Sequence, residues 1–169
     1  MAVPRRMPAD VASGYVIRPA TAQDIPEIVS IWGELALHHA RLDPAFAPSG
    51  DWRDEYRYFV RSLLGRDDAL ALVGAEGTRL VGYAVGRISL LPAFFVNRRR
   101  GYIHDVVIRE AHRRRGVGRR LVEGLLLWMR GQGVTLIELT VATRNTEAVA
   151  FWERLGFSTY MVHMKRALD

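Results

Sequence analysis

The chain has 169 residues, of which 49% are hydrophobic and 25% charged, values typical of one folded domain with a hydrophobic core. It contains no cysteine, which excludes disulfides, thiolate metal sites and a cysteine acyl-enzyme. The formal net charge is +6, and Lys165 is the only lysine. Such a charge can signal nucleic-acid binding, but we favour a general use of arginine together with one anion-binding pocket.

The chain has no apolar run near the roughly 18 residues that span a bilayer, so no membrane partner is expected. The segment 1–14 contains two arginines but no apolar stretch, so we interpret it as a flexible tail rather than a secretory signal. Residues 15–169 are expected to form a single domain, and the expected location is the cytoplasm.

The first half of the chain predicts a strand, two helices and a hairpin. A short strand is expected at Tyr15–Pro19, and a capping box at Thr21–Asp24 precedes a helix. Asp24–Glu27 is a rival helix start, which would place Pro26 in the first turn. Apolar spacing predicts a second helix over Trp52–Leu64. The hairpin is expected at Ala69–Ala75 and Leu80–Leu90, with its turn at Glu76–Thr78.

The second half predicts strands that alternate with helices. The expected elements, in order, are a loop at Pro92–Gly101, a strand at Tyr102–Arg109, a helix at Val117–Arg130, a strand at Leu136–Ala142, a helix capped by Asn145 and a final strand at Phe157–Lys165. A strand–helix–strand unit places its two strands parallel with a right-handed crossover. The sequence therefore predicts a mixed sheet with helices on both faces.

The run Arg113–Arg120 is the most informative stretch, because it lies between a predicted strand and a helix start. Backbone N–H groups of such a turn and the helix dipole favour a bound anion. Gly116 and Gly118 allow the backbone to come close to a phosphate, and arginine supplies forked donors for its oxygens. The sequence therefore predicts a phosphorylated ligand at this turn.

Two motifs resemble the GCN5-related N-acetyltransferase superfamily. Its cofactor signature, Arg/Gln-x-x-Gly-x-Gly/Ala, appears at Arg113, Gly116 and Gly118. Its downstream pattern is met at Asn145, Ala148, Phe151, Trp152, Glu153, Gly156 and Phe157. The start, Ile17–Thr21 with Asp24, also looks like the family's first strand and helix, so the resemblance covers nearly the whole chain from Tyr15.

The resemblance implies an α/β fold of the acyl-CoA N-acyltransferase type, with a mixed, mostly antiparallel sheet, one splayed parallel strand pair and helices on both faces. It implies acetyl-CoA as cosubstrate, no metal, and direct transfer of the acetyl group to a primary amine on a small molecule or peptide. A homodimer is also implied. The residues matched to the cofactor are Val106, Val107, Ile108, Arg113, Arg114, Arg115, Gly116, Val117, Gly118, Arg119, Asn145 and Trp152. A backbone N–H near Val107 or Ile108 would polarise the acetyl carbonyl.

His104 and Asp105 are the candidates for taking the proton of the amine, because histidine titrates near neutral pH and the family often has a carboxylate on this strand. Neighbours on a strand face opposite sides unless a bulge intervenes. Trp152 replaces the family's usual tyrosine, and an indole N–H cannot protonate the leaving sulfur. Water, Tyr160 or Tyr102 would serve instead, or the thiolate leaves unprotonated.

The acceptor pocket is expected to involve Glu34, His38, Tyr56 and Phe94, on the weaker ground that the first two helices contact acceptors in the family. His38 and His39 point about 100° apart on a helix, which is poor spacing for a metal. Two alternatives stay open: a non-catalytic acyl-CoA sensor, and a nucleic-acid-binding regulatory module. The basic turn lacks the third glycine of a dinucleotide-binding motif, and it lacks the Gly-Lys-Ser/Thr of a P-loop.

Overall fold

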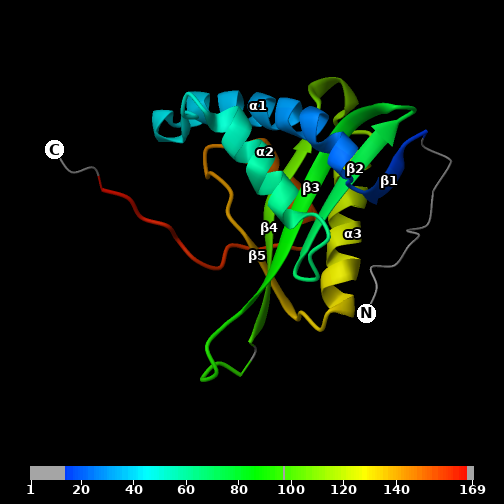
Figure 1. Cartoon of the computed structure of the whole chain (residues 1–169). Helices are drawn as coiled ribbons and strands as arrows, with labels where there is room; N and C mark the ends of the chain where they lie inside the picture. The colour runs from blue at the N-terminus through cyan, green and yellow to red at the C-terminus, as the bar shows by residue number, and fades with distance from the viewer. Residues whose placement is uncertain (1–13, 97, 167–169) are drawn as a thin grey trace.

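The computed structural model describes residues 14–96 and 98–166, and it shows the predicted mixed sheet (Figure 1). Five strands lie in the order β1-β2-β3-β4-β5, and all neighbours are antiparallel except β4 and β5. The strands are β1 (Val16–Pro19), β2 (Ala69–Glu76), β3 (Arg79–Leu90), β4 (Arg99–Ile108) and β5 (Leu136–Leu139). Apart from Gly14, the predicted N-terminal tail lies outside the described residues.

Helices cover the two faces of the sheet and divide the core into two clusters. The main helices are α1 (Ile25–Leu42), α2 (Trp52–Leu63), α3 (Val117–Gly131) and α4 (Thr146–Arg154). Helices α1 and α2 lie on one face, where buried Tyr83, Val85 and Val107 meet Ile28 and Val60. Helix α3 lies on the other face, and side chains of α4 pack against the same core cluster as α3. No helix of the described residues is long and apolar enough to cross a membrane.

Helix α3 lies close to the sheet because two glycines face it. A Cβ on Gly86 would lie 2.7 Å from Cε of Met129, and one on Gly101 would lie 2.6 Å from its sulfur. Neither distance is compatible with a real side chain, so these positions hold α3 against β3 and β4. They also mark which residues of the two strands face α3.

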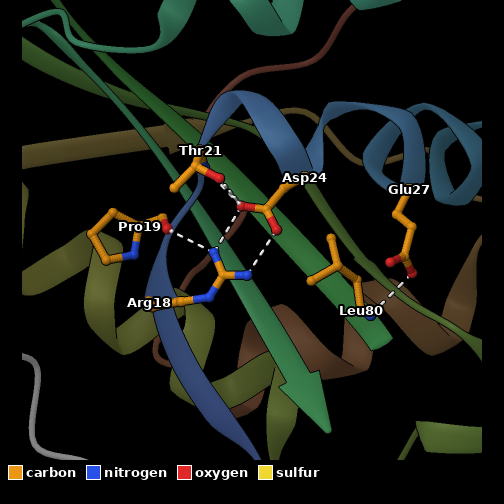
Figure 2. Close-up of polar contacts among 6 residues, drawn as sticks. All are labelled: Arg18, Pro19, Thr21, Asp24, Glu27 and Leu80. Atoms are coloured by element: carbon orange, nitrogen blue, oxygen red, sulfur yellow. Dashed lines mark hydrogen bonds and ion pairs between the residues drawn. The ribbon is translucent and has the colours of Figure 1, made fainter. Parts of the chain in front are cut away.

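Helix α1 is fixed to the sheet by polar contacts at its start (Figure 2). The Arg18 guanidinium donates two hydrogen bonds of 2.7 Å to the Asp24 carboxylate, which also accepts from the Thr21 N–H at 2.7 Å. One turn later the Glu27 carboxylate accepts from the backbone N–H of Leu80 on β3 at 3.0 Å. The predicted capping box is present, and it opens a single 3₁₀ turn, Ala22–Asp24, from which α1 continues.

Two predicted boundaries and one predicted strand are wrong. The predicted loop Pro92–Gly101 is shorter, because β4 begins at Arg99 and pairs with Leu90. The strand predicted over Leu136–Ala142 ends at Leu139, where its pairing with β4 stops. The predicted final strand Phe157–Lys165 is not a strand, since the segment pairs with no neighbour in the described part of the chain and Val162 and Met164 are exposed.

The Asp24 contacts predict acid sensitivity. The hydrogen bond from Arg18 is the largest cause that lowers the pKa of Asp24 from 3.8 to about 2. A depressed carboxyl pKa stabilises the fold above the unfolded value, and the contribution is lost as the pH falls from about 4 to about 2. We expect Asp24→Asn to lower the free energy of unfolding by about 1–2 kcal/mol at pH 7. Urea unfolding between pH 2 and 7 would measure this.

The matched control is Asp67→Asn, since Asp67 is exposed and makes no hydrogen bond or ion pair with described residues. It should leave the pH dependence of unfolding unchanged. An Asp24→Asn variant with the wild-type acid profile would contradict the prediction.

Candidate active site

The turn before α3 has the geometry of an anion cradle. Arg114 and Gly116 have positive φ angles of 58° and 81°, which direct successive N–H groups toward one side. The backbone N–H groups from Arg114 to Arg119 have no hydrogen-bond partner among the described residues, and the next N–H, that of Arg120, bonds the Gly116 carbonyl at 3.1 Å. The turn therefore presents a row of unpaired donors at a helix N-terminus.

The arginines of this turn divide into two groups. Arg115 donates to the Tyr15 hydroxyl at 3.2 Å, and Arg119 pairs with Glu123 at 2.7 Å, so both side chains point away. Arg113 and Arg114 instead line a polar hollow of about 330 Å³, together with Glu110 and Glu147. Two guanidinium groups therefore border the space beside the unpaired N–H groups.

Strand β4 separates from its parallel neighbour before it reaches this cradle. The pairing of β4 with β5 runs from Arg100 opposite Leu136 to Ile103 opposite Leu139, and then stops. β4 continues to Ile108, and on its other edge it stays paired with β3 to the end. From residue 104 to 108 one edge of β4 therefore has no partner strand among the described residues, as expected for the predicted splay.

A β-bulge places His104 and Asp105 on the same face. Val85 lies opposite Asp105 and the next residue, Gly86, lies opposite Ile103, so His104 is an extra residue in β4. Ile103 packs on the α3 side, whereas Asp105 bonds Tyr56 and the His104 ring lies 6.0 Å from that of Phe59. Both contacts come from α2. The bulge thus places both predicted proton acceptors on the α1–α2 side of the sheet.

A hydrogen-bonded chain of two tyrosine hydroxyls reaches the Asp105 carboxylate from the core. The Tyr56 hydroxyl donates to Oδ2 of Asp105 at 2.6 Å, and it lies 2.9 Å from the hydroxyl of Tyr83, which is fully buried. Because the single proton of Tyr56 goes to Asp105, Tyr83 must donate to Tyr56. Burial raises the pKa of Asp105 above its usual range, and the hydrogen bond from Tyr56 opposes that rise.

The surroundings of His104 favour its neutral form. Its partial burial is the larger cause that lowers its pKa, and the positive charge of Arg87 lowers it further. The ring also lies 4.9 Å from that of Tyr102, whose hydroxyl bonds the Thr140 hydroxyl at 2.8 Å. A neutral imidazole beside a half-buried carboxylate is able to accept a proton near neutral pH.

The remaining predicted cofactor residues lie on the open stretch of β4 and on α4 with its cap. Val106 and Ile108 pack on the α3 side, and buried Val107 packs under α1 and α2. Asn145 caps α4 by accepting from the Ala148 N–H at 3.2 Å. Trp152 packs edge-on against Phe151 and Phe157, at 5.0 and 5.2 Å between ring centres, so packing alone accounts for its indole.

The structure does not bring all predicted acceptor residues together. Tyr56 lies at the site, but Glu34 forms an ion pair with Arg109 and His38 lies near the end of α1. Phe94 is 82% exposed beyond the start of β4, on the order of 20 Å along the strand from Asp105. Tyr160 is 70% exposed in the segment without strand pairing. Sequence reasoning missed Tyr83 and Arg87, because only strand register places them at the site.

Comparison with known proteins gives a family match and a set of distant relatives. The Acetyltransferase (GNAT) family model matches residues 35–157. The chain is 23% identical over 143 residues to the uncharacterized N-acetyltransferase MJ1207 of Methanocaldococcus jannaschii, covering 85% of this chain and 60% of that protein. It is 39% identical over 87 residues to the N-alpha-acetyltransferase RimI of Mycobacterium tuberculosis, covering 50% of each. The chain thus spans between half and 60% of these two relatives.

Solved structures share the fold at low sequence identity. A tetramutant of the BH1408 protein from Bacillus halodurans superposes with a TM-score of 0.80 at 24% identity, covering 90% of this chain and 99% of that one. The aminoglycoside N-acetyltransferase AAC(6′)-Iy in complex with CoA superposes with a TM-score of 0.71 at 17% identity, covering 90% and 94%. These matches confirm the predicted fold class.

The tyrosine contacts predict how Asp105 titrates. We expect Tyr56→Phe to raise the pKa of the Asp105 carboxyl further, because the hydrogen bond that stabilises the carboxylate is lost. The free energy of unfolding should fall by about 1–2 kcal/mol, since the Tyr83 hydroxyl also loses its acceptor. Carboxyl ¹³C NMR titration and urea unfolding measure the two effects. Tyr102→Phe is the control, and an equal shift of the Asp105 pKa in both variants would refute this assignment.

Proposed function

Because this chain belongs to the acetyltransferase (GNAT) family, we propose that it transfers an acetyl group from acetyl-CoA to a primary amine by direct attack within a ternary complex. The observation that carries the proposal is the bulge in β4, which presents His104 and Asp105 together where β4 parts from β5. The amide cradle lies at the other end of the same open edge.

The cradle and the open edge fit the two ends of acetyl-CoA. The unpaired N–H groups from Arg114 to Arg119 would hold the pyrophosphate, with Arg113 and Arg114 adding charge. The edge from Val106 to Ile108 would bond the pantetheine amides. Alternate residues of a strand direct their N–H groups to opposite edges, so one of Val107 and Ile108 points away from β3 and is able to polarise the acetyl carbonyl.

The pair on the bulge would supply the acid–base chemistry. The Asp105 carboxylate binds the incoming ammonium, and neutral His104 takes one of its protons. The nitrogen lone pair then attacks the acetyl carbon, the carbon–sulfur bond breaks, and CoA leaves as a thiolate. The second proton of the nitrogen passes through water to the thiolate sulfur, which leaves the neutral amide. Trp152 has no part in this proton transfer, since an indole N–H is not an acid near neutral pH.

The cradle predicts a separable effect on cofactor affinity. The double variant Arg113→Ala/Arg114→Gly should weaken acetyl-CoA binding about tenfold or more, because two charged donors at the hollow are lost. Glycine at 114 also relieves the positive φ of 58°, so the fold should keep its stability. Titration calorimetry and thermal unfolding measure the two effects.

The matched control is Arg119→Ala, which removes an arginine held by Glu123 but keeps its backbone N–H. It should change acetyl-CoA affinity by less than about twofold. Equal affinity losses in the control and in the double variant would overturn the proposed cofactor site.

Turnover tests the catalytic pair. We expect His104→Gln to lower kcat about 10²–10⁴-fold, the usual range for loss of a proton-transfer group, while the KM for acetyl-CoA changes little. In the wild type, kcat/KM should fall on the acid side as the accepting group becomes protonated. His104→Gln should remove or move that acid limb if His104 takes the proton. An unmoved limb would assign the role to Asp105.

The rival proposal is a non-catalytic acyl-CoA sensor, and the presence of Trp152 where the resemblance implies tyrosine is the observation in its favour. The two differ in one measurement. An enzyme releases CoA thiol above background with some member of an amine panel, and it forms an acetylated product of the expected mass. A sensor binds acetyl-CoA in calorimetry and releases none.

A further inference from the structure

Two arginines lie on the same face of the sheet as His104 and Asp105. Arg87 on β3 lies opposite Tyr102 on β4, and paired residues share a face. Gly101 faces α3, as its contact with Met129 shows, so its neighbours Arg100 and Tyr102 face the other side. Arg87 and Arg100 therefore lie diagonally across the strand pair, just beyond the bulge.

Neither guanidinium group makes a full set of hydrogen bonds within the described structure. Nε and Nη1 of Arg100 are buried and make no hydrogen bond in the described structure, and the Glu138 carboxylate lies 3.8 Å from Nη1. Arg87 is half-buried and makes no hydrogen bond or ion pair with any described residue. Buried donors without acceptors are costly, so this pair favours an incoming anion.

Arg87 lies between two titratable groups and is paired with neither. Its charge contributes to a lower pKa of Asp68 on one side and of His104 on the other. The Asp68 carboxylate is already occupied by Arg66, which donates two hydrogen bonds of 2.6 and 2.8 Å. The Arg87 guanidinium is thus available beside the imidazole.

We propose that the acceptor amine carries an anionic oxygen group, a carboxylate or a phosphate, which Arg87 and Arg100 bind while the amine lies at Asp105. This inference rests on the proposed acetyl transfer. Val85 is opposite Asp105 and Arg87 follows two residues later, so the two ends of the acceptor are separated by on the order of 7–10 Å. Arginine forks suit both anions, and they repel a polycationic acceptor.

Matched acceptors test the proposal. The pairs are ethanolamine and phosphoethanolamine, cadaverine and lysine, and tyramine and tyrosine, with spermidine as the polycation. We expect kcat/KM to be at least tenfold higher for the anionic member of at least one pair, with spermidine poorest. A preference within the ethanolamine pair indicates a phosphate, and a preference within either of the other two pairs indicates a carboxylate. The absence of a preference for the anionic member in every pair would overturn the proposal.

Variants assign the preference to the arginines. Arg87→Gln should remove most of the discrimination within the preferred pair, and Arg87→Lys should restore part of it, because the charge returns without the fork. Arg99→Gln is the control, since Arg99 donates to the Gln132 carbonyl instead. An unchanged preference in Arg87→Gln would refute the role of Arg87.

A binding measurement separates failure of this inference from failure of the proposed function. The His104 imidazole can be followed by NMR without cofactor while the same amines are added. The anionic member should raise the pKa of His104, because it offsets the charge of Arg87, and Arg87→Gln should abolish this response. If no amine is acetylated but this response appears, the anion site stands and acetyl transfer fails. If amines are acetylated and no response appears, the anion site fails.

Discussion

The extra residue in β4 is the constraint on which the candidate site depends. Without it, His104 and Asp105 would face opposite sides of the sheet, and one of them would point into the packing of α3. The shift occurs between Val85 and Gly86 on the partner strand, and Gly86 is held close to Met129. Gly86 therefore lies both at the register shift and at the contact with α3, and the bulge determines which residues of β4 face α2.

A second consequence follows from where β4 and β5 part. The strands separate after Ile103, which is the residue just before the bulge. The local bend and added twist of a bulge direct a strand away from its neighbour. The open edge of β4 thus begins at the same irregularity that turns two polar side chains toward α2, so the proposed cofactor edge and the proposed acceptor face meet at one point.

The sequence predicted the parts of the structure that local chemistry decides. The turn from Arg113 to Gly118 was recognisable because glycine spacing, basic charge and the flanking apolar runs are all local. The bulge was not predictable, because register depends on how β3 and β4 pair over their whole length. For the same reason the buried Tyr83 looked like an ordinary core residue, although its hydroxyl ends the hydrogen-bonded chain to Asp105.

Strand length was the weakest part of the sequence prediction, for a related reason. Ala142 continues an apolar, β-branched run, yet β5 stops at Leu139 because its neighbour leaves. The segment from Phe157 also has strand-like residues, but a strand exists only where a partner edge accepts its hydrogen bonds. The preference of a residue for strands reflects how well its side chain packs on a pleated sheet. Tertiary contacts decide whether a sheet is present at that place.

Carboxylate partners account for several of the arginines that make the chain basic. Many have a nearby carboxylate that occupies them, as Asp24 does for Arg18, Asp68 for Arg66 and Glu123 for Arg119. A nucleic-acid surface would instead present free guanidinium groups across a broad face. Arg113 and Arg114 line the hollow beside the amide cradle, and Arg87 and Arg100 lie beyond the bulge. The two pairs lie at opposite ends of the open edge of β4, where we propose that acetyl-CoA and the anionic group of the acceptor bind.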